Sequence, residues 1–191
     1  MELPPPNVPE ELLEGWSVSD RSIETPFDLG VVTVTAHTVV YEDERRRERI
    51  REAAGIDGRW RFIFASRVRI RPETVASNAL TRIVRSRAEN GFEARLTERG
   101  FDGVTKEGTR SMRIGRSTAT LTRYRGRCRV GETTVPTAAL FAVWPSDRDY
   151  YVAGGAYPTG VPSALEDTAA LFDPDADRAE LLRILRSMGD E

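Results

Sequence analysis

Hydrophobic and polar residues alternate along the stretch from Arg59 to Arg71. One set of alternate positions is apolar and the other is basic: Trp60, Phe62, Phe64, Val68 and Ile70 against Arg59, Arg61, Arg67, Arg69 and Arg71. Successive side chains of a β-strand point to opposite faces of the sheet. The pattern therefore predicts a strand with one apolar face and one arginine-rich face.

A second strand is predicted from Val31 to Tyr41, which is rich in the strand formers Val and Thr. Val32, Val34, Ala36 and Val40 fall on one face, and Thr33, Thr35, His37 and Tyr41 fall on the other. Further strands are expected at residues 16–23, 110–114 and 117–130, with a turn at 26–30. Residues 137–144 and 150–157 flank Pro145-Ser146-Asp147-Arg148-Asp149, a spacing typical of a β-hairpin.

Helix signals appear in several places along the chain. Residues 9–15 are expected to form a short helix or a single turn. Further along, Pro72-Glu73-Thr74 opens a helix that Asn90-Gly91 is expected to close, and residues 92–99 form a second helix ended by Gly100. Ser163 and Glu166 have the spacing of a capping box for a short helix to Phe172. Asp173-Pro174 is expected to cap a last helix with an apolar stripe: Leu181, Leu182, Ile184, Leu185 and Met188.

Residues 42–52 are charged at ten of eleven positions, with Ile50 as the exception. This composition predicts a solvated helix or a mobile insertion over residues 42–58. Residues 1–8, with three consecutive prolines, are expected to be flexible. No internal repeat or long linker divides the chain, so residues 1–191 are predicted to form one α+β domain, a mostly antiparallel sheet flanked by helices in an α/β/α sandwich.

Paired strands follow the stretch Phe92-Glu93-Ala94-Arg95-Leu96-Thr97-Glu98-Arg99-Gly100-Phe101, and the closing helix at 182–188 follows Tyr150-Tyr151-Val152-Ala153-Gly154-Gly155-Ala156. This order of elements resembles that of PsbP-like domains. The resemblance covers residues 60–188 and implies a non-catalytic binding or assembly protein. The charged segment at 42–52 departs from that layout. The Arg- and Thr-rich composition would also suit an uncharacterised family of halophilic archaea.

The composition excludes several kinds of site. One Cys and one His in 191 residues exclude a disulfide framework, a Cys-rich zinc site and a multi-His metal centre. We expect no metal and no cofactor, because no phosphate-binding, nucleophile-elbow or metalloprotease motif is present. The longest apolar run, residues 138–144, is far short of the ~20 residues that span a bilayer. Without a secretory signal, a cytoplasmic protein is expected.

The near-zero net charge of −2 conceals a strong asymmetry along the chain. Residues 59–130 hold 18 Lys+Arg and 6 Asp+Glu, a net of +12, while residues 1–58 (6 against 13) and 131–191 (4 against 11) are each at −7. The arginines could form an anion-binding face for a nucleic acid, with Tyr124 stacking on a base. The favoured alternative is that the acidic terminal segments cover and neutralise them. The candidate residues are Arg59, Arg61, Arg67, Arg69, Arg71, Arg123, Arg125 and Arg127.

Other chemistry-bearing residues have ordinary structural interpretations. His37 is interpreted as a polar residue on a half-exposed strand, Cys128 as an inert buried thiol, and Asp147 and Asp149 as turn residues. We therefore predict no catalytic residue and a binding or accessory protein, with a protein partner as one option. Polyanion binding through the arginines and a small metal-independent enzyme remain the alternatives.

Overall fold

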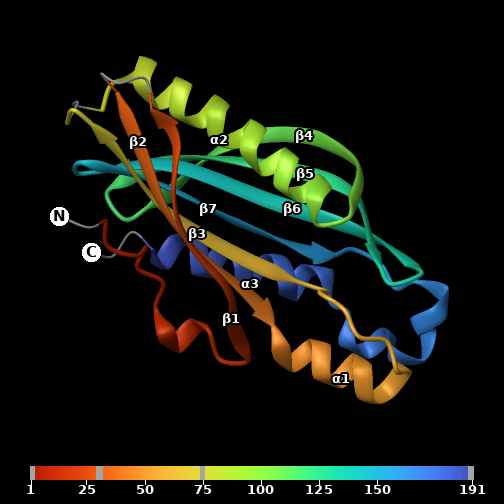
Figure 1. Ribbon diagram of the computed structural model, residues 1–191. Coiled ribbons are helices and arrows are strands. Elements are labelled where there is room, and N and C mark those ends of the chain that lie inside the picture. Colours follow the sequence, from red (N-terminus) through yellow and green to blue (C-terminus); the bar gives the residue numbers. More distant parts are fainter. Residues whose placement is uncertain (1–2, 29–31, 74–75, 189–191) are drawn as a thin grey trace.

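The computed structural model describes residues 3–28, 32–73 and 76–188. Its centre is a seven-stranded sheet with the order β1-β2-β3-β7-β6-β5-β4, in which every neighbouring pair is antiparallel. Helix α2 lies across one side of this sheet and α3 across the other (Figure 1). The strands are β1 (Trp16–Asp28), β2 (Thr33–Asp43), β3 (Phe62–Arg71), β4 (Phe101–Ile114), β5 (Ser117–Val130), β6 (Thr133–Ser146) and β7 (Asp149–Pro158). The predicted α+β class is confirmed.

The helices are placed by sequence signals at their ends. They are α1 (Glu44–Ala54), α2 (Asn78–Glu98) and α3 (Pro174–Ser187), with two 3-10 helices, η1 (Glu10–Leu12) and η2 (Ser163–Leu171). The Asp173 side chain accepts a hydrogen bond from the Ala176 amide at the start of α3, as the Asp-Pro pair predicted. None of the described helices is long and apolar enough to cross a membrane.

Two apolar cores lie on opposite faces of the sheet. The face towards α3 buries Ile63, Leu121, Leu140 and Trp144 against Leu181 and Ile184. The face towards α2 buries Phe62, Tyr124, Phe141 and Val152 against Phe92 and Leu96. The alternation predicted for β2 and β3 is confirmed, because Val40 and Phe62 belong to the α2 core while Ile63 and Ala65 belong to the α3 core.

The two faces are not covered equally. Six inter-strand spacings of ~4.8 Å make a seven-stranded sheet ~29 Å wide, whereas one helix is ~10–12 Å across. On the α3 face the N-terminal segment supplies additional cover, since Val8, Leu12 and Leu13 join that core. On the other face α2 packs against β4 and β6. Several apolar side chains of β2 and β3 on that face, Val34, Val68 and Ile70 among them, are therefore only partly covered by the described residues.

Three expectations about the helices differ from the structure, the first being the start of α2, which begins at Asn78 and not at Pro72-Glu73-Thr74. Asn90-Gly91 does not end a helix, since α2 runs through it; the i, i+4 row of Leu80, Val84, Ala88, Phe92 and Leu96 continues across the glycine. A glycine inside a helix costs only ~1 kcal/mol, which the packing of this row offsets. Ser163 caps nothing, because the N-cap of η2 is Pro162 and no side chain accepts a hydrogen bond there.

The charged segment forms helix α1, and both this helix and the N-terminal segment make buried contacts. Helix α1 buries Ile50 completely and docks on α3 through the ion pair Arg46–Asp177, 2.6 Å between Nη1 and Oδ2. Leu3 and Val8 are buried, while residues 1–2 lie outside the described chain. The predicted hairpin is confirmed with a tighter turn, since β6 and β7 pair up to Ser146 and Asp149, and Asp147 takes a φ of 44°.

Candidate functional site: a cavity beneath helix α2

A cavity of about 490 Å³ lies between α2 and the part of the sheet that this helix leaves partly covered. Sixteen of its 23 lining residues are apolar. The sheet wall comes mainly from β2 and β3, where every second side chain faces the cavity. These positions are Val34, Ala36, Thr38 and Val40 on β2, and Phe62, Phe64, Ser66, Val68 and Ile70 on β3.

The length of the cavity follows from the elements that line it. Phe62 and Ile70 are eight residues apart on β3, which spans ~26 Å at ~3.3 Å per residue. Leu80 and Arg99 bound the α2 wall, and nineteen steps of ~1.5 Å give ~28 Å. The two measures agree, so the site is an elongated slot that runs along α2.

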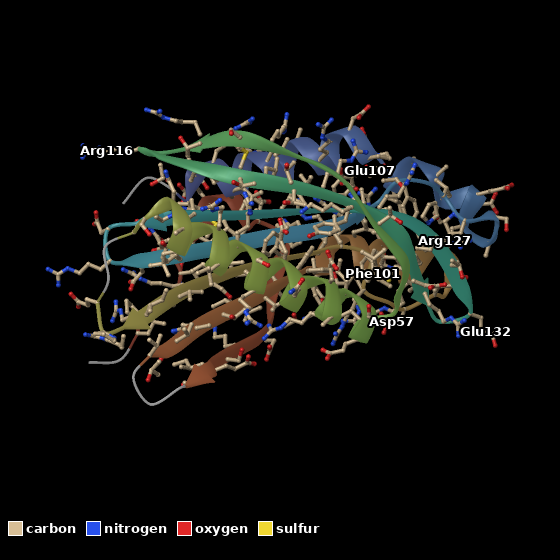
Figure 2. The ribbon with its side chains drawn as sticks, turned by 90° about the horizontal axis from the view of Figure 1, so that it is seen from above. Asp57, Phe101, Glu107, Arg116, Arg127 and Glu132 are labelled. Atoms are coloured by element: carbon tan, nitrogen blue, oxygen red, sulfur yellow. The ribbon has the colours of Figure 1, made fainter. Side chains whose placement is uncertain are left out.

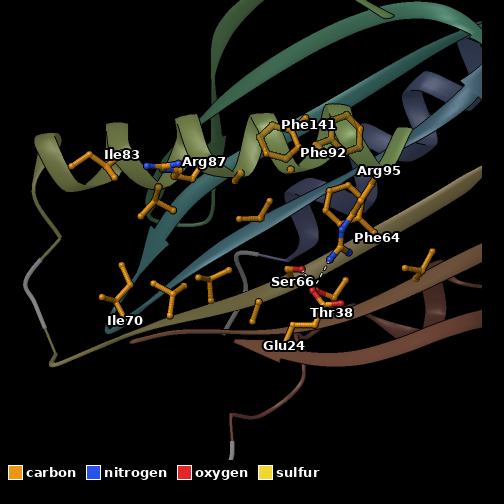
Figure 3. Close-up of a pocket in the computed structure, with 18 of the residues that line it drawn as sticks. Glu24, Thr38, Phe64, Ser66, Ile70, Ile83, Arg87, Phe92, Arg95 and Phe141 are labelled. Carbon is orange, nitrogen blue, oxygen red and sulfur yellow. Dashed lines mark hydrogen bonds and ion pairs between the residues drawn. The ribbon is translucent and has the colours of Figure 1, made fainter. Parts of the chain in front are cut away.

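Three stacked phenylalanine rings form the inner floor of the slot (Figure 3). The ring centroids of Phe64 and Phe92 are 5.4 Å apart and those of Phe92 and Phe141 are 5.0 Å apart. They join β3, α2 and β6 in one apolar block. Such stacked aromatic contacts fix the rings in place, so the floor is formed by the fold itself.

Polar groups in the slot are few and stand at defined places. The hydroxyls of Thr38 and Ser66, which are opposite each other on β2 and β3, form a hydrogen bond within the sheet wall. Arg95 reaches from α2 across the cavity and its Nη2 lies 2.8 Å from Glu24 Oε2 on β1 (Figure 3). Both side chains of this ion pair are about half exposed, 47% and 49%, so the pair bridges the mouth at its solvent edge.

Arg99 lies at one end of the slot, and its environment differs from that of Arg95. Its Cζ lies 5.0 Å from the centroid of the Phe62 ring, and the side chain is half-buried. Among the described residues, no carboxylate oxygen comes within 4 Å of it, whereas Arg59 nearby is held by Glu42 at 2.9 Å. Burial and repulsion from the Arg59 charge outweigh the attraction of the Glu42 and Asp20 charges, and so lower the pKa of Arg99 below that of an ordinary arginine.

Few side chains that line the slot are titratable. The titratable side chains among the described lining residues are Glu24, Arg87, Arg95 and Arg99. A nucleophile needs an adjacent base, but the Thr38 and Ser66 hydroxyls are hydrogen-bonded to each other. Elsewhere in the described chain, no group of three or more His, Cys, Asp or Glu side chains could hold a metal ion.

The structure places the arginines of the predicted anion-binding face beside carboxylates. Arg61 is buried, at 5% exposure, and its guanidinium lies 2.9 Å from Asp43 and 2.7 Å from Glu180. Arg67 and Arg69 both contact Asp149, at 2.6 and 2.8 Å.

The two arginines at the ends of this row are also paired. Arg71 lies 3.3 Å from Glu73. Arg59 precedes β3 and pairs with Glu42, on the face that β2 turns towards α2, so it does not share a face with the others.

The arginines of β5 are more open to solvent. Arg123 and Arg125 share Glu107 at 2.8 and 3.3 Å, and Arg127 is exposed (Figure 2). Their side of β5 is that of Leu121, which faces the α3 core. These three residues therefore lie on the opposite side of the sheet from the cavity. Polyanion binding by this face stays a prediction.

His37, Cys128 and Asp149, which the sequence analysis also considered, lie in contacts within the fold. The Nδ1–H of His37 donates a hydrogen bond to the Leu3 carbonyl oxygen, with 3.0 Å between Nδ1 and the oxygen. This bond ties the N-terminal segment to β2. Burial raises the pKa of the Cys128 thiol to about 11, so the thiol stays protonated near neutral pH. Asp149 is buried and clamped by Arg67 and Arg69.

Sequence reasoning missed the cavity, although one signal for it was present. Gly91 lies inside a 21-residue helix and lines the slot between Arg87 and Arg95. A Cβ added at Gly91 would meet no heavy atom within 4 Å, so no neighbouring protein atom requires glycine there. Glycine at this position leaves the mouth of the slot free of a side chain.

Comparison with known proteins gives a family. A family model described as "Domain of unknown function (DUF6517)" matches residues 5–189. The chain belongs to this family. The match covers all the described strands and helices, so the sheet, α2 and the cavity all lie within the family's domain. No curated protein matches the chain.

Proposed function

We propose that this protein is a non-catalytic binding protein that holds a small molecule with a long apolar part in the slot beneath α2. The observation that carries the proposal is the cavity itself, about 490 Å³ and lined mostly by aliphatic and aromatic side chains. Ligand sites in proteins have volumes of ~300–1,000 Å³ and combine an apolar lining with a few placed polar groups. This slot meets both criteria.

The unequal cover of the sheet supports the same conclusion. On the α3 face the N-terminal segment closes the space beside the helix, and Leu3 and Val8 are buried. On the α2 face, Val34, Val68 and Ile70 remain only partly buried within the described chain. Leaving apolar area in water costs ~25 cal/mol per Å². A ligand that covers these side chains would recover that free energy on binding.

The alternatives predicted from the sequence have less support. The β3 arginines that could contact a polyanion already pair with carboxylates, and a nucleic acid would have to displace those partners. A binding role also agrees with what the resemblance to PsbP-like domains implies. We include a cytoplasmic site of action in this proposal.

A titration with the neutral fluorophore N-phenyl-1-naphthylamine tests this proposal, because its emission increases in apolar sites. We expect saturable binding at one site per chain and displacement by dodecanol. The Gly91→Leu variant, which narrows the slot, should bind the fluorophore at least ten-fold more weakly. A linear, non-saturating signal, or equal binding by both proteins, would contradict the proposal.

A further inference from the structure

We propose that the ligand of the slot is a single-chain amphiphile with a carboxylate head, and that Arg99 binds this carboxylate. The inference rests on the proposed function, because it assigns a chemical class and an orientation to the molecule that the slot holds. It comes from the distribution of charge along the slot.

The positive side chains of the slot all belong to α2 and its C-cap. Arg87, Arg95 and Arg99 line it, and Gly91 falls in the same i, i+4 row between the first two. Arg95 is held by Glu24 at 2.8 Å, and Arg87 has an interaction of its own. Arg99 has no carboxylate within 4 Å among the described residues. The guanidinium best placed to accept a new anionic partner is therefore at the Arg99 end.

The surroundings of Arg99 strengthen an ion pair formed there. The side chain is half-buried and lies against the Phe62 ring, so water screens its charge less than at the open surface. A guanidinium can donate two parallel hydrogen bonds to one carboxylate. A dianionic phosphate would bring a second charge, but the neighbouring Arg59 is already paired with Glu42 at 2.9 Å. A monoanionic head therefore fits this end best.

The opposite end of the slot fits an apolar tail. Val32, Val34, Ile70, Leu80 and Ile83 line it, and Ile83 is one of the few large hydrophobic side chains exposed in the described chain, at 59%. The β3 residues that line the slot, Phe62 to Ile70, span ~26 Å at ~3.3 Å per residue. One leaflet of a bilayer core, which holds one acyl chain, is ~15 Å thick. The slot is thus long enough for one acyl chain that lies along α2 with its head at Arg99.

The test compares dodecanoate with dodecanol, measured by displacement of N-phenyl-1-naphthylamine from the wild-type protein and from Arg99→Gln. We expect wild-type protein to bind dodecanoate at least ten-fold more tightly than dodecanol. In Arg99→Gln this preference should disappear while dodecanol affinity is unchanged. Arg127→Gln, which removes an exposed arginine on the other side of the sheet, is the matched control and should keep the full preference.

The outcomes separate the two proposals. Equal affinity of wild-type protein for dodecanoate and dodecanol would overturn the carboxylate assignment and leave the apolar slot intact, whereas binding of neither would overturn both. Tighter binding of dodecyl phosphate than of dodecanoate would also overturn the carboxylate assignment. If Arg99 served only to cap α2, Arg99→Gln would melt at a lower temperature without any change in head-group preference. Arg99→Lys, which keeps the charge, should restore part of the preference.

Discussion

Replacement of Gly91 by leucine separates the requirements of the fold from those of ligand binding. Gly91 lies mid-way along α2 on the rim of the slot, and a Cβ added there has no heavy atom within 4 Å. A leucine side chain at this position would extend over the mouth between Arg87 and Arg95. The change should therefore stabilise the protein and at the same time obstruct the slot.

The expected gain in stability has two parts. Replacing a helix-interior glycine by a good helix former contributes ~1 kcal/mol. Full burial of a leucine side chain stabilises a protein by ~1.5–3 kcal/mol. Position 91 is at the exposed rim, so a leucine there should contribute about half of the lower value. The sum is about 2 kcal/mol, which corresponds to a rise in Tm of ~4–8 °C for a chain of this size.

Differential scanning fluorimetry and titration with N-phenyl-1-naphthylamine measure the two effects. Gly91→Ala should gain about 1 kcal/mol from helix propensity and keep its binding. Ser86→Leu adds a leucine on exposed helix surface ~140° around α2, at ~100° per residue, and should bind like wild type. A Gly91→Leu protein that melts lower than wild type, or that binds the fluorophore equally well, would refute this reasoning.

Three further predictions concern side chains outside the slot. Arg61→Met leaves buried carboxylates without their shared partner, and should lower the free energy of unfolding in urea by about 3 kcal/mol. Burial pushes the pKa of Asp149 upward, but hydrogen bonds from Arg69 and Arg67 outweigh it and hold the pKa below that of an ordinary aspartate. The stability from this clamp is therefore present above pH ~4 and lost as the pH falls further. Wild type should exceed Asp149→Asn in stability at pH 5–8, and this advantage should shrink as the pH falls below ~4; an advantage that stays constant or grows on acidification would contradict the assignment. The Cys128 thiol should react with a disulfide reagent at pH 8 only after unfolding, since burial raises its pKa to about 11; rapid reaction in the native protein would argue against its burial.

Strand positions were predictable because their patterns are local. The alternation on β3 and the hairpin of β6 and β7 follow from side-chain direction and turn chemistry, and both are confirmed. The extent of α2 was not predictable in the same way. Asn90-Gly91 is a strong local stop signal, but the apolar row of Val84, Ala88 and Phe92 packs on the sheet and carries the helix through it.

The candidate site depends on contacts between segments far apart in the sequence. The slot exists because β1, β2 and β3 extend the sheet beyond the width of one helix, and no local pattern reports how far a helix reaches across a sheet. The ion pairs of Arg61 with Asp43 and Glu180 join the basic middle of the chain to both acidic ends. The charge asymmetry anticipated such pairing, but it could not identify the partners.

Methyl resonances of the protein during a titration with dodecanoate test the central claim most directly. The slot is lined by Val68, Ile70 and Ile83, whereas Leu181 and Ile184 lie in the core on the other face of the sheet. We predict that the methyl signals of the first three residues shift and saturate together, while those of Leu181 and Ile184 stay in place. Shifts confined to the α3 face, or no saturable shift at all, would contradict the assignment of a ligand site beneath α2.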